Sequence, residues 1–300
     1  MRDAFFSQLY EIARDDRRVI LLSSDFGAPS LDKYRRDLAT QFISTGVAEQ
    51  NMVNVARGLA MAGKIVYTYA ILPFYMRCYE QIRHLCFQNL NVNLVGVGAG
   101  FSYSTAGPTH HALEDIAAMR ALPNLTILNA SDSTMAGAFA GITYKGSGPK
   151  YIRLDRASLE RPYPLGEDFS AGFIDYGGSQ ISTIVATGCM VAQAGYVAEK
   201  LRKKNIDVGI IDLYRIKPLK RELIERLKLG DYIVTLEENY INGGIGSIIS
   251  EILHDNNQAQ KLLRLGVPDQ YYSNYSGREE LHRLSRLDVE SIAEEILEWL

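Results

Sequence analysis

The chain has 300 residues, 47% of them hydrophobic and 22% charged, with a formal net charge of −3 at pH 7. This length predicts about two domains of ordinary size, and the composition is typical of a folded globular protein. The near-neutral charge argues against a nucleic-acid-binding surface, and neither a signal peptide nor an apolar run of the ~18 residues that would span a membrane is expected.

The first forty residues predict a helix, a strand and a charged loop. Apolar residues at helical spacing indicate a helix over 1–15, and the apolar run 19–22 predicts a strand. The loop that follows carries Lys33, Arg35 and Arg36. Two interpretations fit this basic group: contact with a phosphate, or a solvated charged face, which is the commoner role of a charge run.

The next stretch places an acidic residue at the start of an apolar helix. A strand at 42–44, a turn at Gly46, a helix from about Ala48 and a strand at 64–69 put Glu49 in the first helical turn. The helix is apolar around most of its circumference, so we expect burial on more than one side. Glu49 either complements the partial positive charge of the helix N-terminus or belongs to a binding site.

Two further candidates follow strands. Phe74 lies where the chain turns from the 64–69 strand into the next helix, and a strand at 92–97 leads into a Gly-rich loop with His110 and His111. We expect a helix at 111–121 directly after them. Glu49, Phe74 and His110 thus fall at carboxyl ends of strands, where open α/β sheets bind ligands. The alternative for Phe74 is a core position.

A strand at 125–129, a helix capped by Asp132 and an edge strand at 151–156 complete a first domain, predicted at 1–160. Near its end, Arg153 is interpreted as structural. Arg156 is either a substrate contact or a surface arginine at a domain end.

A linker rich in Pro and Gly is predicted at 161–175. In 176–300, apolar runs at 181–188, 208–212, 231–239 and 261–267 alternate with amphipathic helices, which indicates a second three-layer α/β domain. The glycines of INGGIGS fit a close-packing turn better than a nucleotide cradle. Isolated histidines, namely His84, His254 and His282, are interpreted as helix surface or core. Three cysteines without metal spacing favour a reduced, cytoplasmic setting.

The ordered motifs GVAEQNM, GLAMAGK, GPTHHALEDIA and MRALPN resemble the pyrimidine-binding domain of transketolases and their relatives. Downstream, ATGCMV, IDLYRIKPL and LEENYINGGIGS resemble the C-terminal domain of the same family. The resemblance covers nearly the whole chain. It implies an α/β fold class of two three-layer domains: a thiamine-diphosphate-binding, pyrimidine-type fold, then a transketolase C-terminal-like domain.

The resemblance also implies roles for individual residues. Glu49 matches the glutamate that hydrogen-bonds the aminopyrimidine of thiamine diphosphate and drives activation of that cofactor. Phe74 matches the ring that stacks on the aminopyrimidine, with Ile71 and Arg77 adjoining it as further cofactor contacts. His110 matches a histidine that addresses substrate oxygen.

Two more positions are matched less specifically. His111 either reaches the substrate or caps the following helix. Arg156 matches the arginine that binds the sugar phosphate, a task suited to a planar guanidinium.

The sequence departs from the family at two positions of the donor pocket. Many transketolases carry an acidic residue directly before Gly-Pro-Thr-His and a histidine eight residues earlier, where this chain has Ala106 and Gly98. We expect these substitutions to enlarge the donor pocket and to make it less polar. The identity of the donor therefore stays open.

The chain has no Gly-Asp-Gly signature of the family's diphosphate-binding domain. The resemblance thus implies a partner subunit that holds the diphosphate through Mg²⁺, most simply in a heterotetramer, with no metal ligand in this chain. The expected activity is transfer of a two-carbon ketol unit from a ketose, expected to be phosphorylated, to an aldose. Alternatives are a transferase for a modified sugar or 2-oxoacid donor, the β subunit of a 2-oxoacid dehydrogenase, and a catalytically silent scaffold subunit.

Overall fold

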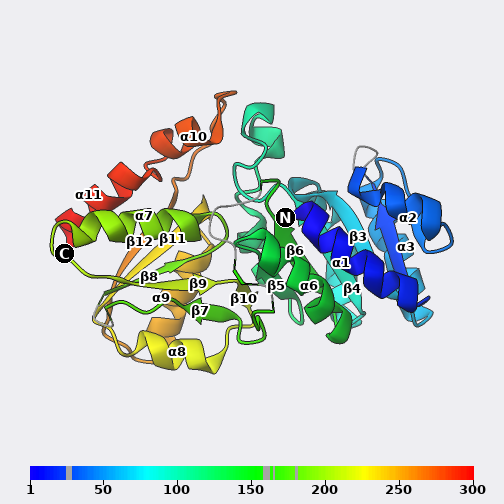
Figure 1. Cartoon of the computed structure of the whole chain (residues 1–300), viewed down its shortest axis with the longest axis horizontal. Coiled ribbons are helices and arrows are strands. Elements are labelled where there is room, and N and C mark those ends of the chain that lie inside the picture. Colours follow the sequence, from blue (N-terminus) through cyan, green and yellow to red (C-terminus); the bar gives the residue numbers. More distant parts are fainter. Residues whose placement is uncertain (25–28, 158–162, 165, 180–181) are drawn as a thin grey trace.

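Residues 1–24, 29–157, 163–164, 166–179 and 182–300 are described in the computed structural model of the chain, which forms two α/β units side by side (Figure 1). The first is built on a seven-stranded sheet with the strand order β10-β5-β6-β4-β3-β1-β2. Its strands are β1 (Val19–Ser23), β2 (Phe42–Ser44), β3 (Ile65–Ile71), β4 (Val92–Val97), β5 (Thr126–Asn129), β6 (Lys150–Leu154) and β10 (Arg215–Lys217).

Helices cover both faces of this sheet because each carries an apolar stripe. On one face α1 (Arg2–Asp15) and α6 (Ser133–Lys145) bury Phe5, Phe6 and Phe139 against the strands. On the other face lie α3 (Glu49–Met61), α4 (Tyr79–Phe87) and α5 (Asp115–Arg120). The short α2 (Asp32–Asp37) packs beside α1 through Tyr34, which contacts Tyr10. The three-layer architecture expected from the sequence is confirmed.

The second unit has a five-stranded sheet in the order β12-β11-β8-β9-β7. Its strands are β7 (Phe173–Asp175), β8 (Ser182–Ala186), β9 (Gly209–Leu213), β11 (Tyr232–Tyr240) and β12 (Lys261–Val267). One face packs against α7 (Met190–Arg202) and α11 (Val289–Trp299), and the other against α8 (Arg221–Leu227) and α9 (Ile245–Asp255). Helix α10 (Arg278–Leu284) lies toward the first unit.

Four local expectations differ from the structure. The strand expected at an edge, β6, is interior with all five residues buried, because β4 and β5 pair with it on its two sides. The edge beyond β5 is occupied by β10, which crosses from the second unit and pairs antiparallel with β5. The linker predicted at 161–175 ends in β7, which pairs antiparallel with β9. Part of that linker, 161–162 and 165, lies outside the described residues.

The other two differences concern helices. The helix expected at 111–121 begins only at Asp115, because Gly100 and Ala112 form a β-bridge that keeps 111–114 extended or turned. Helix α3 buries Met52, Val53 and Ala56 on one face, whereas Met61 is 62% exposed in this chain. The expectation that α3 is buried on more than one side is therefore wrong for the isolated chain.

Within the described residues, none of the helices combines the length and the apolar character needed to cross a membrane.

Candidate functional site

Glu49 is a buried carboxylate, which costs desolvation free energy unless the group has a partner. It follows β2 and the left-handed turn at Gly46 (φ 66°), begins α3, and is only 5% exposed. Its Oε2 lies 3.6 Å from Nη1 of Arg77, whose side chain is 59% exposed. This contact is an ion pair longer than a hydrogen bond. The carboxylate therefore keeps capacity to accept a further donor.

Phe74 and Arg77 belong to a 3₁₀ segment, Leu72–Cys78, that directly continues β3 after its last residue, Ile71. The Arg77 guanidinium carbon lies 4.7 Å from the centre of the Phe74 ring, within cation–π range. The Gln50 side-chain amide donates a 2.8 Å hydrogen bond to the Arg77 carbonyl. Helix α3 thus fixes the segment that carries the aromatic ring.

His110 meets this segment from the next strand connection. It ends the 3₁₀ turn Pro108–His110, and its ring centre lies 5.4 Å from that of Phe74 in an edge-on arrangement. The Thr109 hydroxyl is 2.9 Å from His110 Nδ1, which leaves Nε2 as the ring nitrogen able to address a ligand. The predicted residues Glu49, Arg77, Phe74 and His110 are therefore brought together in one row.

Tyr103 extends the row and changes the expectation for the donor pocket. Gly98 has φ 104°, and a Cβ there would lie 2.4 Å from Tyr103 Cδ2, so the Tyr103 ring fills that space. Its ring centre is 6.2 Å from that of His110. Hence the absence of a side chain at Gly98 does not enlarge the pocket on this side, because an aromatic ring from the same loop replaces it.

Arg156 follows β6 and is exposed, with its guanidinium carbon 5.4 Å from the Tyr103 ring centre. Its backbone N–H donates a 2.9 Å hydrogen bond to Ser102 Oγ. The side chain therefore stands at the far end of the row from Glu49, where it can meet an anionic group of a ligand.

His111 faces the interior rather than the row. It is 3% exposed, its ring packs edge-on to Phe101, and Nε2 donates to the Ser104 carbonyl at 3.2 Å. Burial lowers the pKa of His111, so the ring is neutral at pH 7 with the proton on Nε2. It does not cap α5, which begins four residues later. This geometry favours a role in shaping the loop.

The remaining charged and Gly-rich motifs have local partners. Arg35 pairs with Asp32, Arg36 pairs with Asp37, and Lys33 Nζ lies 3.7 Å from Glu11, as in a solvated charged face. The turn in INGGIGS is closed from inside the chain, because Glu237 accepts the backbone N–H groups of Ile245 and Gly246. Burial raises the pKa of Glu237 to about 7.

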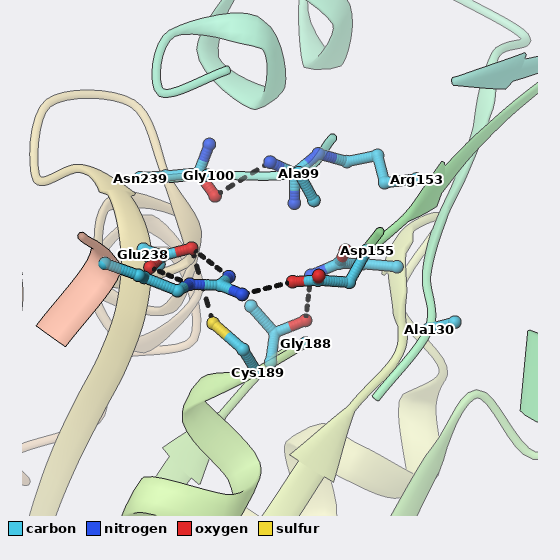
Figure 2. Close-up of a pocket in the computed structure, with 12 residues that line it drawn as sticks. Ala99, Gly100, Ala130, Arg153, Asp155, Gly188, Cys189, Glu238 and Asn239 are labelled. Atoms are coloured by element: carbon cyan, nitrogen blue, oxygen red, sulfur yellow. Dashed lines mark hydrogen bonds and ion pairs between the residues drawn. The ribbon is translucent and has the colours of Figure 1, made fainter. Parts of the chain in front are cut away.

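Sequence reasoning missed a polar network between the two units. Glu238 and Asn239 at the end of β11, together with Arg278 of α10, line a small enclosed pocket with Arg153 and Asp155 (Figure 2). The three consecutive polar residues of LEEN at the end of an apolar strand were a signal, but the partners of Glu238 and Asn239 lie far away in the sequence. Among the described residues, no cluster of three or more His, Cys, Asp or Glu side chains suits a metal ion.

Two family models match the chain. The model of the transketolase pyrimidine binding domain matches residues 1–162, and that of the transketolase C-terminal domain matches residues 175–292. Together they span both units of the structure.

Similar proteins cover almost the full length. A protein of Methanocaldococcus jannaschii named as a transketolase C-terminal section is 34% identical, over 99% of this chain and 95% of its own length. A 6-deoxy-6-sulfo-D-fructose transketolase subunit of a Clostridium species is 34% identical, over 90% of this chain and 85% of its own. A split-gene transketolase solved as an inactive β4 tetramer superposes with a TM-score of 0.86 at 28% identity, covering 99% and 96%.

Proposed function

This chain belongs to the transketolase family, and from that premise we propose that it is the pyrimidine-binding subunit of a two-chain, thiamine diphosphate-dependent transketolase. The complete enzyme transfers a two-carbon ketol unit from a ketose to an aldose. The observation that supports this proposal best is the row formed by buried Glu49, Phe74 and His110 at the carboxyl ends of the first sheet.

The row fits an aminopyrimidine. A ring nitrogen of that heterocycle needs a carboxyl partner out of water, and Glu49 is 5% exposed with one ion-pair contact at 3.6 Å. The heterocycle also needs an apolar face, which the half-buried Phe74 ring and the end of β3 at Ile71 supply. When bound, thiamine diphosphate supplies the carbon nucleophile for the ketose carbonyl.

The side chains of this chain bind and orient the cofactor and the substrate and transfer protons. Glu49 holds a proton at the ring nitrogen. The positive charge of Arg77 balances the negative charge of the Glu49 carboxylate. His110 presents Nε2 to a substrate oxygen, where it donates or accepts a proton. Arg156, at the far end of the row, binds the anionic end of a sugar phosphate. His111 hydrogen-bonds the Ser104 carbonyl within the loop and is not assigned to substrate binding.

The other half of the cofactor site belongs to a partner subunit. The sequence contains no Gly-Asp-Gly signature, so we place the Mg²⁺ ion and the diphosphate on a second chain type. The relative solved as a tetramer of one chain type is described as inactive, which supports a requirement for the partner. A two-fold symmetric heterotetramer in the cytoplasm is the simplest assembly.

The test compares substitutions of two matched glutamates in the complex with the partner. Glu49 and Glu80 both lie in the first turn of a helix, but only Glu49 is buried. Glu49→Gln should lower kcat for ketol transfer by about 10²–10⁴-fold, the usual contribution of a positioned proton-transfer group, and Glu80→Gln should not. Equal activity of both variants would contradict the role of Glu49. A scaffold subunit would give no dependence on either glutamate.

A second candidate is transfer from a modified sugar. Tyr103 in place of a side chain at Gly98, and Ala106 beside Gly107, give the donor side a different surface from the family pattern. One relative acts, by its name, on a sulfonated ketose. Phosphorylated, sulfonated and uncharged ketoses, and pyruvate as a 2-oxoacid, should therefore be compared by kcat/KM in the same complex. Preference for pyruvate would exclude both ketose assignments.

A further inference from the structure

The loop that carries His110 is closed at its base and held by the other unit. It runs from Gly98 to Ala112 between β4 and α5, and the Gly100 and Ala112 backbones exchange hydrogen bonds of 3.2 and 3.0 Å. We call residues 98–112 the His110 loop. Its tip contributes Tyr103 and His110 to the row described above. The position of the tip therefore depends on what fixes the base.

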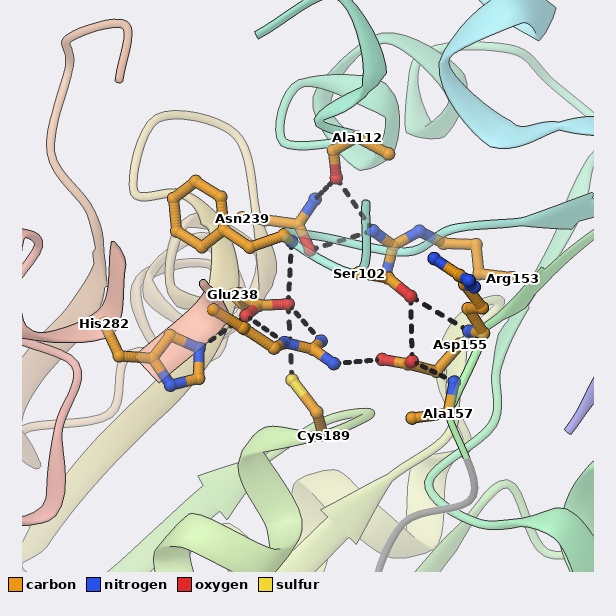
Figure 3. A network of polar contacts seen from close by, with 12 residues as sticks. Ser102, Ala112, Arg153, Asp155, Ala157, Cys189, Glu238, Asn239 and His282 are labelled. Atoms are coloured by element: carbon orange, nitrogen blue, oxygen red, sulfur yellow. Dashed lines mark hydrogen bonds and ion pairs between the residues drawn. The ribbon is translucent and has the colours of Figure 1, made fainter. Parts of the chain in front are cut away.

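Two consecutive side chains at the end of β11 grip both sides of this base (Figure 3). Glu238 Oε2 accepts the Phe101 backbone N–H at 3.0 Å, and Asn239 Nδ2 donates to the carbonyls of Ala112 (3.4 Å) and Leu113 (3.1 Å). The fit at Gly100 is close, because a Cβ there would lie 1.9 Å from Glu238 Oε2. The second unit thus sets the base of a loop of the first.

Arg278 of α10 connects Glu238 to the end of β6. Its Nε donates to Glu238 Oε1 at 2.7 Å, and its Nη1 lies 2.7 Å from Asp155 Oδ2 as an ion pair without hydrogen-bond alignment. His282 Nε2 also contacts Glu238 Oε1, at 2.5 Å. The Glu238 and Asp155 side chains are only 4% and 3% exposed. Burial opposes ionisation of Glu238, yet Arg278 and His282 hold its pKa well below the usual value.

From Asp155 the network reaches Arg156. Asp155 Oδ1 accepts hydrogen bonds from Ser102 Oγ at 2.9 Å and from the Ala157 backbone at 2.8 Å. Ser102 Oγ in turn accepts the Arg156 N–H at 2.9 Å. One set of contacts therefore fixes the His110 loop on one side and the Arg156 backbone on the other.

We propose that Glu238 and Arg278 are positioning residues through which the C-terminal unit sets the geometry of the transfer site, holding the His110 loop and Arg156 in register. The inference rests on the proposed function for the roles of His110 and Arg156, but not for the contacts themselves. It gives the C-terminal unit a role at a site whose proposed substrate contacts, His110 and Arg156, lie in the first unit.

The experiment uses the complex with the partner and three variants: Arg278→Met, Arg278→Lys and Ser102→Ala. The matched control is Arg283→Met, on the same helix, which removes an exposed ion pair with Glu280. Hydrogen–deuterium exchange of peptides covering 98–113 and 153–157 reports positioning directly, and exchange in α1 and α6 reports the fold. Kinetics with phosphorylated and uncharged ketoses report the consequence.

For Arg278→Met we expect faster exchange in 98–113 and unchanged exchange in α1 and α6. We also expect kcat to fall by about 10²-fold, because a small displacement of a positioned group costs about that much in rate. Arg278→Lys keeps the positive charge, but its ammonium group cannot bind two carboxylates together. We therefore expect wild-type exchange in α1 and α6 and faster exchange in 98–113. Ser102→Ala should mainly raise KM for phosphorylated donors. Arg283→Met should match the wild type.

The outcomes separate two failures. Unchanged exchange in 98–113 for both Arg278→Lys and Ser102→Ala, with unchanged kinetics, would overturn the positioning role. If Arg278→Met does not fold, the double variant Glu238→Gln/Arg278→Met is measured in its place, because it also removes the buried charge of Glu238 and leaves Asp155 with its hydrogen bonds from Ser102 and Ala157. Loss of loop protection in a complex whose wild type transfers no ketol unit would instead contradict the proposed function and leave the positioning network standing.

Discussion

At the scale of single residues, Glu49 and Glu80 show how differently one local pattern is used. Both are glutamates in the first turn of a helix after a strand, yet Glu49 is buried beside Arg77 and Glu80 is exposed. The sequence predicted Glu49, Phe74 and His110 together because each lies in the connection that follows a strand of one sheet. It did not predict Tyr103 as the side chain that fills the space at Gly98, since a ring's direction depends on the loop's backbone.

Phe74 should contribute to cofactor affinity through its ring. Phe74→Leu removes an aromatic face worth about 0.5–1.5 kcal/mol beyond its buried area, so Kd of thiamine diphosphate should rise about 2–10-fold with kcat at saturation nearly unchanged. Phe74→Tyr keeps the ring and should bind like the wild type. Titration calorimetry of the complex measures both. Equal loss in both variants would show that shape at this position matters and stacking does not.

Arg156 should discriminate donors by charge. Arg156→Met is expected to raise KM about tenfold for ketoses with a phosphate or sulfonate end, because a charge-assisted hydrogen bond is lost, and to leave uncharged ketoses unaffected. Arg83, exposed on α4, supplies the control Arg83→Met. A similar KM increase for charged and uncharged donors would remove Arg156 from the anion site.

At the scale of elements, most strands and helices followed from apolar periodicity, and the misjudged ones depend on contacts distant in sequence. Strand β6, expected at an edge, is interior because β4 and β5 pair with it, and β10, a three-residue strand from the other unit, covers the edge beyond β5. The start of α5 at Asp115 is set by the bridge between Gly100 and Ala112. Arg278 had no sequence signal, because its partners Glu238 and Asp155 come from two other segments.

Strand β9 contributes a titrating group between the units. Asp212 is fully buried and accepts hydrogen bonds from Ser131 Oγ (2.8 Å) and Tyr163 OH (2.5 Å), and burial raises its pKa to about 7. An unfolded aspartate titrates near 4. The folded chain therefore holds a proton that the unfolded chain releases, so this stabilisation is complete below about pH 4 and is lost as the pH rises to about 7.

Asp212→Asn should remove that contribution. The free energy of unfolding of the wild type contains a component that falls by about 1.4 kcal/mol per pH unit between about pH 4 and 7, and the variant lacks it. Urea unfolding at a series of pH values measures both curves. The variant keeps the contribution of Glu237, whose pKa is also raised to about 7 by burial, and of Glu114 and Asp132, whose pKa values burial also raises. Parallel curves for the two proteins would contradict the assignment to Asp212.

At the scale of the whole molecule, the two units share both a sheet and a polar network. Strand β10 ties the second unit to the first sheet, Glu238 and Asn239 bind the His110 loop, and Arg278 pairs with Asp155 at the end of β6. The row from Glu49 to Arg156 is thus complete on one chain, but the sequence lacks the diphosphate-binding signature. Under the proposed function, the cofactor site of this chain is completed by another polypeptide.

That central claim is tested most directly by reconstitution. Thiamine diphosphate binding, measured by titration calorimetry with Mg²⁺, and ketol transfer are determined for this chain alone, the diphosphate-binding partner alone, and the two mixed. We predict tight binding and transfer only in the mixture, with transfer lost when Glu49→Gln replaces the wild type. Binding and transfer by this chain alone at the level of the mixture would contradict it.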